Sequence, residues 1–363
     1  MRRIPVRCLK LGSTIATDVY DSNFRVLVKK GSVVDEKIIE DLEKCKVISI
    51  YITDEYGSKD VDDVITPELR VRAAKQLKIM ALELLKIQIT KRYDIIRLDY
   101  IDKLRITAGK IVDELIADNS RRIKQFDIRN KENYRYYHCV NVAVLATIIG
   151  IELKYKEEKL VKLAMAGLLH DVGKIFLPND VLEKETDRDF EEDEVFRLHT
   201  KMGYEYLSRY LNIEREVKRC ILNHHEKVDG TGYPRQIRGK EIDEFSKIIS
   251  VVDFYDNLIA SGYILEDNLP GNVVELIMSH VESSFDYNLV RILSKKAVPF
   301  LAGTIVQLSN GDAAVVIETT QGMPLRPIVK IIKSNNEHMI DKYVNLEEKL
   351  DLVIVKVLYY LDE

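Results

Sequence analysis

Histidine and aspartate residues carry the chemistry that can be recognised in this 363-residue chain, which has only 7 histidines. His170 and Asp171 are adjacent at the end of an apolar run, and His224 and His225 are adjacent just before a glycine-rich stretch. Imidazole and carboxylate bind first-row divalent metals, and a His-Asp pair at a helix end can turn both side chains toward one cavity. Neighbouring residues on a helix diverge by about 100°, so the His-His pair suits two different ions. The spacing predicts a metal site.

The alternative is that the histidines are scattered, each of them solvated or satisfied within a core. For any single histidine this alternative is the better one, and His280 and His338, which have no partner in the sequence, keep it. His138 lies in a helical stretch, and His199 falls between the two pairs. For these two and the paired histidines taken together, we favour metal binding.

Two segments resemble the signatures of the HD-GYP phosphodiesterases. Residues 170–174 read HDVGK, and residues 224–234 read HHEKVDGTGYP, with HH, DG and GYP all in register. An HD pair alone is a weak signal, whereas the long second signature is specific. The resemblance covers about residues 131–297. It implies an all-helical HD fold, a multinuclear iron or manganese centre, and hydrolysis of the bacterial second messenger cyclic di-GMP.

The resemblance also implies a set of metal ligands by position. These are His138, His170, Asp171, His199, His224, His225 and Asp253. The set exceeds what one tetrahedral zinc ion uses. Shared between two roughly octahedral ions bridged by Asp171, it leaves places for a hydroxide and for phosphate oxygens. The expected reaction is in-line attack of the bridging hydroxide on cyclic di-GMP, which yields linear pGpG.

Residues beside the ligands are expected to contact the substrate. Lys174 is assigned a catalytic role together with Asp171, because its ammonium group can reach a phosphate oxygen. The alternative for Lys174 is a solvated lysine after a helix-ending glycine. Further substrate contacts are expected at Gly232, Tyr233, Pro234 and Asp256. Whether the GYP loop contacts the ligand or a signalling protein is left open.

Two departures from the family pattern bear on function. The segment after Asp253 retains Asp256 but lacks the phosphate-binding arginine of family members. A charge-assisted bond of about 1.5–3 kcal/mol is thereby lost, which weakens binding roughly ten- to hundredfold if nothing replaces it. Tyr134 lies one helical turn before His138, where members with three metals carry a glutamate. We therefore expect two ions.

Two other functions stay open. One is a catalytically weak, metal-bound sensor that binds a cyclic dinucleotide and signals through a protein partner. The other is an HD phosphohydrolase that acts on another phosphodiester. The missing arginine favours the sensor, and the complete ligand set favours the enzyme.

The elements that position these residues predict an α+β chain of three parts. Residues 1–63 form a small α/β region with β-prone runs at 15–20 and 25–28, a helix at 35–45 and a strand at 47–52. Residues 60–63 make an acidic linker. Residues 64–297 are helical, with the core motifs at 131–297, and residues 298–363 form a small β-domain.

Within the helical part, Pro67 is expected in the first turn of a helix capped by Thr66, and a second long helix is expected at 100–117. In the first helix, the residues expected to form one apolar stripe are Val71, Ala74, Leu77, Ile79, Leu82, Leu85 and Ile89. After Pro299 the expected strands are 304–308, 313–317, 327–332 and 352–359, with a hairpin turn at Asn310-Gly311-Asp312.

Composition limits the class of protein. A hydrophobic content of 46% and a charged content of 31% indicate a folded chain, and the net charge of -4 argues against a nucleic acid polymer or a membrane surface as partner. No apolar run reaches the roughly 18 residues of a membrane span, and the N-terminus does not look like a signal peptide. Cysteines at 8, 45, 139 and 220 form no C-x-x-C pair, so we expect free buried thiols and a cytoplasmic location. Homodimer formation is left open.

Overall fold

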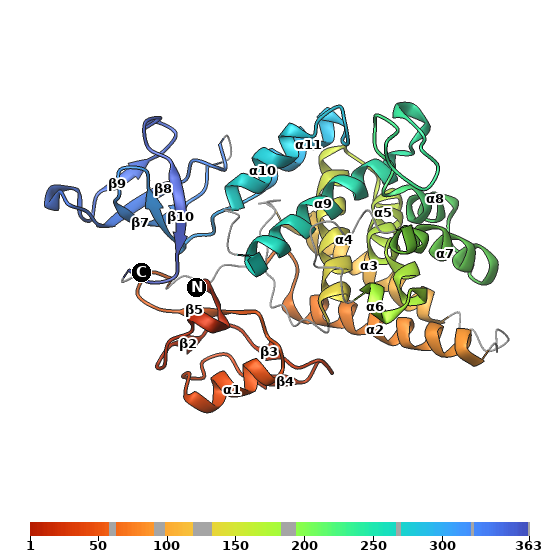
Figure 1. Ribbon diagram of the computed structural model, residues 1–363, viewed down its shortest axis with the longest axis horizontal. Coiled ribbons are helices and arrows are strands. Elements are labelled where there is room, and N and C mark those ends of the chain that lie inside the picture. Colours follow the sequence, from red (N-terminus) through yellow and green to blue (C-terminus); the bar gives the residue numbers. More distant parts are fainter. Residues whose placement is uncertain are drawn as a thin grey trace.

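The chain forms a helical body with two small β-rich parts on one side of it (Figure 1). This computed structural model describes residues 1–57, 63–90, 99–118, 133–182, 194–265, 270–320 and 323–361, without the side chains of 260–265 and 270. The predicted α+β class is confirmed. The predicted linker at 60–63 lies outside the described residues except for Asp63. No helix within the described ranges is long and apolar enough to span a bilayer.

The N-terminal part is built on a three-stranded antiparallel sheet. Its order is β1 (Arg2–Pro5), β5 (Ser49–Thr53), β2 (Thr14–Ile15), and β3 (Val19–Tyr20) pairs separately with β4 (Val26–Val28). A short 3-10 helix, η1 (Val6–Cys8), follows β1. Helix α1 (Glu36–Lys44) begins after Asp35, whose carboxylate accepts a hydrogen bond from the backbone of Ile38. The expected strand at 15–20 is wrong as one element, because residues 14–15 and 19–20 pair with different partners.

The C-terminal part is a five-stranded antiparallel sheet of order β10-β6-β7-β8-β9. All four expected runs contain strands, and β9 is an additional, three-residue strand. The strands are β6 (Ile305–Leu308), β7 (Ala313–Glu318), β8 (Ile328–Lys333), β9 (Tyr343–Asn345) and β10 (Ile354–Leu358). The 3-10 helix η6 (Glu337–Met339) lies between β8 and β9.

The two terminal parts contact each other, and both chain ends lie at their junction (Figure 1). The guanidinium group of Arg2 pairs with Asp54 at 2.6 Å and donates to the carbonyl oxygen of Tyr359. The same side chain lies over the ring of Tyr360. Buried Tyr51 belongs to a small apolar cluster against which Leu301 packs. Residues at opposite ends of the sequence therefore form a continuous flank of the molecule.

The helical body occupies most of residues 67–296. Its helices are α2 (Pro67–Thr90), α3 (Asp99–Ala117), α4 (Tyr134–Glu152), α5 (Glu157–Leu169), α6 (Asn179–Leu182), α7 (Glu194–Tyr210), α8 (Arg215–Asn223), α9 (Glu244–Leu265), α10 (Pro270–Ser279) and α11 (Tyr287–Lys296). Two 3-10 helices, η3 (Val172–Phe176) and η5 (Gly239–Glu241), lie in the connections after α5 and α8. Thr66 caps α2 as predicted, since its hydroxyl accepts from the backbone of Leu69.

The apolar stripe predicted for α2 is partly wrong. Its members Ile79, Leu82, Leu85 and Ile89 are exposed, whereas Met80, Leu84 and Ile87 are buried. The helix carries apolar residues on more than one side, so the sequence alone did not identify the side that faces the core. The buried side also includes a charged residue, Arg70.

Helix α4 runs through the centre of the body and is buried on nearly all sides from Tyr137 to Gly150. Helix α5 crosses it closely at Gly167, where an added Cβ would lie 2.5 Å from the Cα of Ala143. A glycine is needed for this approach because no larger side chain fits between the backbones. The crossing brings His138, on α4, beside His170 at the end of α5.

Candidate metal centre

Five helical segments bring the expected ligands into one buried region. His138 comes from α4, His199 from α7 and Asp253 from α9. His170 and Asp171 follow α5, and His224 and His225 follow α8. Six of these side chains are at most 6% exposed, and His225 is half-buried.

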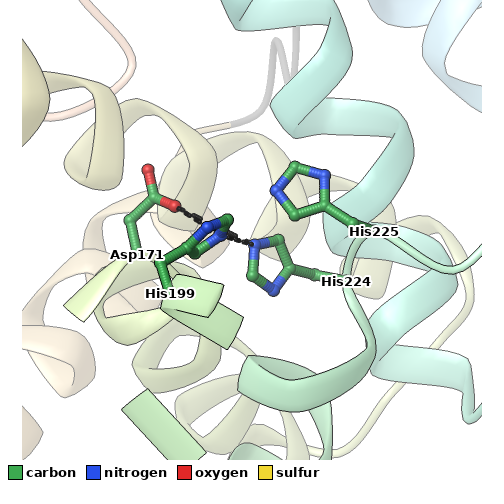
Figure 2. A group of neighbouring side chains, drawn as sticks. All are labelled: Asp171, His199, His224 and His225. Atoms are coloured by element: carbon green, nitrogen blue, oxygen red, sulfur yellow. Dashed lines mark hydrogen bonds and ion pairs between the residues drawn. The ribbon is translucent and has the colours of Figure 1, made fainter. Parts of the chain in front are cut away.

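The side chains form two groups that share one carboxylate. One group is Asp171, His199, His224 and His225, shown in Figure 2, and the other is His138, His170 and Asp171. Within each group, one potential ligand atom per residue lies within 4.8 Å of all the others. Asp253 belongs to neither group but lies beside the second one, with its Oδ1 atom 2.9 Å from His138 Nε2 and 3.6 Å from His170 Nε2. Asp171 thus stands where a bridging ligand between two ions would stand.

Backbone carbonyls fix the orientation of three imidazoles. The Nδ1 atoms of His170, His199 and His224 lie 2.8, 2.6 and 3.0 Å from carbonyl oxygens three residues earlier in the chain. A carbonyl only accepts, so each Nδ1 carries the proton and donates it. Each Nε2 is thereby left to face the cluster as a lone-pair donor, the arrangement common among metal-binding histidines.

The electrostatics of the cluster fit a cation. Burial lowers the pKa of His199 to about 4 and that of His224 to about 3, which keeps both rings in the neutral, ligating form. Burial also lowers the pKa of His138, but the hydrogen bonds that its ring donates to Asp253 and Asp256 outweigh this effect and raise that pKa to about 10. The acidic side of the cluster therefore attracts positive charge, as metal binding requires.

Unsatisfied polar atoms point to the same conclusion. His170 Nε2, His225 Nε2 and Asp171 Oδ1 are buried and have no hydrogen-bond partner among the described residues. Each such atom costs about 1–3 kcal/mol when left unpaired. The shortest approaches to Asp171 Oδ1 within its first group are 3.6 Å from His199 and 3.9 Å from His224. The donor set and its orphaned atoms therefore fit divalent metal ions.

Lys174 brings positive charge to the edge of this cluster, and Arg135 lines the same cavity as Lys174. Lys174 is 6% exposed, so the alternative of a solvated lysine is wrong. Its Nζ atom lies 2.7 Å from Asp171 Oδ2 and 5.0 Å from the centre of the Phe196 ring. Lys174, Asp171 and half-buried Arg135 line one cavity, which α2 closes on its other side with Leu77 and Met80. Sequence reasoning missed Arg135, although its position three residues before His138 places it on the side of α4 nearest that ligand.

The GYP loop covers the outer side of His225. The ring of Tyr233 stacks on the imidazole of His225 with centroids 4.7 Å apart. Gly232 permits this, since a Cβ there would lie 2.3 Å from the backbone nitrogen of Lys227. Glu226, another residue that sequence reasoning missed, accepts hydrogen bonds from the backbone of Arg235 and Ile237 and so holds the loop. Pro234 is half-buried.

Asp256 lies in a different place from the one expected of a substrate contact. It is fully buried, and its carboxylate binds the Nδ1 atom of His138 at 2.7 Å and the side-chain amide of Asn141 at 3.1 Å. Nδ1 is on the opposite side of the ring from Nε2, the atom that faces Asp171 and Asp253. Asp256 therefore stands behind the ring of His138, and it contacts protein groups with both of its oxygens.

Tyr134 occupies the position beside His138 that the sequence predicts. Its ring stacks on the His138 ring with centroids 5.9 Å apart. Its hydroxyl donates to Asn257, whose side-chain amide donates to Asp253 Oδ1. The phenol thus supports Asp253 through Asn257, and no carboxylate stands at this position.

Known proteins are similar to this chain in sequence and in fold. A family model described as "HD domain" matches residues 110–289, and one described as "KOW domain associated with HD domain" matches residues 305–360. The cyclic di-GMP phosphodiesterase PdeB of Borreliella burgdorferi is 29% identical over 61% of this chain and 58% of its own length. The cyclic di-GMP phosphodiesterase PA4108 of Pseudomonas aeruginosa is 28% identical over 62% of this chain and 56% of its own length.

A third relative, the 3'3'-cGAMP-specific phosphodiesterase 3 of Vibrio cholerae, is 32% identical over 59% of this chain and 42% of its own length. The chain thus spans less than two thirds of the length of these relatives. Among solved structures, the HDG"Y"P protein Bd1817 of Bdellovibrio bacteriovorus has a TM-score of 0.51 at 16% identity, covering 80% of this chain and 97% of its own, which shows a shared fold. The resemblance read from the two signatures is confirmed: residues 110–289 match the HD domain family, and relatives of this region are named cyclic di-GMP or 3'3'-cGAMP-specific phosphodiesterases.

Proposed function

We propose that this protein is a metal-dependent phosphodiesterase that opens cyclic di-GMP to linear pGpG. The observation that carries the proposal is the buried carboxylate of Asp171, shared by two ligand groups, with Lys174 beside it. Relatives named cyclic di-GMP phosphodiesterases support the choice of substrate.

Two divalent ions, iron or manganese, are proposed as the cofactors. One would be held by His199, His224, His225 and Asp171, and the other by His138, His170, Asp253 and the same Asp171. Bound there, the ions would supply Lewis acidity toward a phosphate oxygen and lower the pKa of a coordinated water. The protein contributes a dry, rigid setting, because nearly every proposed ligand is buried and four of the five histidines are oriented by a hydrogen bond on Nδ1.

Lys174 and Arg135 are proposed to bind the phosphate groups of the substrate. The ammonium group of Lys174 lies at the shared carboxylate, where the scissile phosphate must approach. Its positive charge would stabilise the charge that develops on phosphate oxygens during in-line displacement. Arg135 lines the same cavity from the turn of α4 before His138. It offers the guanidinium group that the segment after Asp256 lacks, and a guanidinium suits a phosphate because it can donate two parallel bonds.

The cysteines bear on the cellular compartment of the protein. All four cysteines are free thiols, although Cys8 and Cys45 are only half-buried, and free thiols suit a reducing compartment. We therefore place the protein in the cytoplasm.

Tyr233 and Pro234 are half-buried in the loop beside His225, where they are proposed to contact the nucleotide or a signalling protein.

Turnover of a panel of cyclic dinucleotides tests the proposal. The protein would be purified without oxygen, loaded with iron or manganese, and incubated with cyclic di-GMP, 3'3'-cGAMP and cyclic di-AMP, with products separated by chromatography. We expect cyclic di-GMP to be cleaved fastest, and Asp171→Asn to be inactive on all three. Binding of cyclic di-GMP without cleavage would contradict the proposal and indicate a sensor.

A second substrate has a specific observation in its favour. The Vibrio cholerae relative named 3'3'-cGAMP-specific is 32% identical to this chain, a value similar to those of the cyclic di-GMP enzymes. Cyclic di-GMP and 3'3'-cGAMP carry the same cyclic phosphate backbone, so contacts from Lys174 and Arg135 do not distinguish them. Faster cleavage of 3'3'-cGAMP in the same panel would make it the substrate.

A further inference from the structure

A buried ion pair stands where the N-terminal part joins the helical body. Arg70, in the first turn of α2, binds the carboxylate of Asp63 through two nitrogens, at 2.7 and 2.8 Å. Both side chains are less than a tenth exposed. A third nitrogen of Arg70 donates to the side-chain oxygen of Asn141 on α4. Asp63 and Arg70 lie before residue 110, where the match to the HD domain begins, and Asn141 lies within that match.

The same contacts continue to a metal ligand. The amide nitrogen of Asn141 donates to Asp256 Oδ1 at 3.1 Å, and Asp256 Oδ2 accepts from His138 Nδ1 at 2.7 Å. The chain of hydrogen bonds therefore runs Asp63, Arg70, Asn141, Asp256, His138. It ends on the ring nitrogen opposite the one that faces Asp171 and Asp253.

His138 is held differently from its neighbours. His170, His199 and His224 bond through Nδ1 to carbonyl oxygens three residues earlier, so their own helices orient them. His138 bonds instead to a carboxylate on α9 that Asn141 orients and Arg70 in turn supports. Its position and its tautomer thus depend on side chains from three helices and on the residue at which the N-terminal part ends.

The stability of the fold does not explain this arrangement. A buried ion pair contributes little more than an apolar pair of the same volume, because both charges lose their hydration. Burial raises the pKa of Asp63 even though Arg70 is bound to it, so desolvation is not fully offset. A role in the site accounts for a costly pair at this point.

We propose that Asp63 and Arg70 are positioning residues of the metal centre, which act on His138 through Asn141 and Asp256. Residues outside the HD domain match would thereby complete the group that contains His138, His170 and Asp171. Partners of this kind around metal ligands are typically worth about 10- to 100-fold in metal affinity. The inference rests on the proposed metal centre but not on any substrate.

The test compares metal binding by the full chain and by a double variant, Asp63→Asn with Arg70→Gln. The variant removes both charges while keeping polar side chains that can still hydrogen-bond. Manganese binding to metal-free protein would be followed by calorimetry, and circular dichroism and thermal unfolding of the metal-free forms would report on the fold. We expect one of the two ions to bind about 10- to 100-fold more weakly and the other to bind as in the parent.

Arg105→Gln is the matched control. Arg105 pairs with Glu214 in a partly exposed position on α3, and its loss should leave the affinity for both ions unchanged. A second variant, Asp256→Asn, tests the middle of the chain independently. Its amide group donates to Nδ1, which moves the ring proton to Nε2 and removes the lone pair that a metal needs. We expect that variant to lose one ion.

Parent-like affinity for both ions in the double variant would overturn the proposal, and so would an equal loss of both ions. A parent protein that binds no divalent metal would overturn the metal centre as well. Normal metal binding by the parent without cleavage of any cyclic dinucleotide would contradict only the proposed function, because the affinity difference is measured without substrate.

Discussion

The ammonium nitrogen of Lys174 lies 2.7 Å from Oδ2 of Asp171, the carboxylate that both ligand groups share. A buried lysine in this position has two effects. It neutralises charge on the carboxylate, and it places a cation in the wall of the cavity that Asp171 also lines. Binding of a phosphate there would give Lys174 a second anionic partner.

Replacing Lys174 with methionine should lower the rate of cyclic di-GMP cleavage by about ten- to hundredfold, because one charge-assisted bond to phosphate is lost. Metal content should stay at the parent level, since Lys174 has no role as a ligand. Initial rates and elemental analysis of the same preparation check both statements. Lys162→Met, which removes the partner of Glu158 on α5, is the control and should be neutral. An undiminished rate for the Lys174 variant would rule out phosphate binding by this residue.

Arg135→Gln should raise KM for cyclic di-GMP by about tenfold, with a smaller change in kcat. The reason is that Arg135 lines the cavity without belonging to either ligand group, so its charge is expected to act mainly on binding. Steady-state kinetics separate the two constants. Arg209→Gln, at an exposed position on α7, should leave both unchanged. If Arg135→Gln has the KM of the parent, the missing arginine of the family pattern is not replaced from α4.

Gly173→Ala should destabilise the protein by roughly 1–3 kcal/mol and disturb His199. The added Cβ would lie 1.9 Å from the carbonyl oxygen of His199, so η3 and α7 must separate. Gly109→Ala is a sharp control, because a Cβ there has no atom within 4 Å and the residue lies inside α3. That control should stabilise the protein by up to about 1 kcal/mol. Denaturant unfolding of the two variants measures the difference, and equal stability would show that η3 and α7 do not pack as described.

Tyr134 should limit the site to two metal ions and to hydrolysis of one phosphodiester bond of cyclic di-GMP. The phenol has a usual pKa of about 10 and is a poor metal ligand at neutral pH, and its hydroxyl is bound to Asn257. The linear product pGpG carries a terminal phosphate whose added charge a third ion would help to bind. We expect pGpG to accumulate in a product time course, and Tyr134→Glu to increase its conversion to GMP. Rapid formation of GMP by the parent would contradict this account of Tyr134.

The sequence predicts the candidate metal-binding residues better than it predicts the residues that hold them in position. His138, His170, Asp171, His199, His224, His225 and Asp253 lie together in the structure, as the two signatures imply. Such ligands have a distinctive residue type and a fixed spacing, so they can be found from a motif. Arg70 has neither of these features, and its bond to Asn141 joins residues 71 positions apart. Only the packing of α2 on α4 brings that pair together.

The errors have a similar physical origin. The apolar stripe predicted for α2 is misplaced because alanine and methionine form much of the buried side, whereas several larger leucine and isoleucine side chains are exposed. The substrate contact predicted for Asp256 rests on its position in the motif, whereas its full burial and its bond to His138 Nδ1 depend on how α9 lies against α4. Strand β1 is not predicted from the sequence, because two arginines and a proline (Arg2, Arg3 and Pro5) are not typical of a strand that pairs with β5.

Titration of metal-free protein with manganese, with cleavage of cyclic di-GMP measured at each addition, tests the central claim most directly. The shared position of Asp171 predicts that cleavage rises only as a second ion binds and reaches its plateau at two ions per chain. His170→Ala and Asp171→Ala should lose most of the bound metal and the cleavage with it. Full cleavage at one ion per chain, or metal content and cleavage unchanged in both variants, would contradict the account.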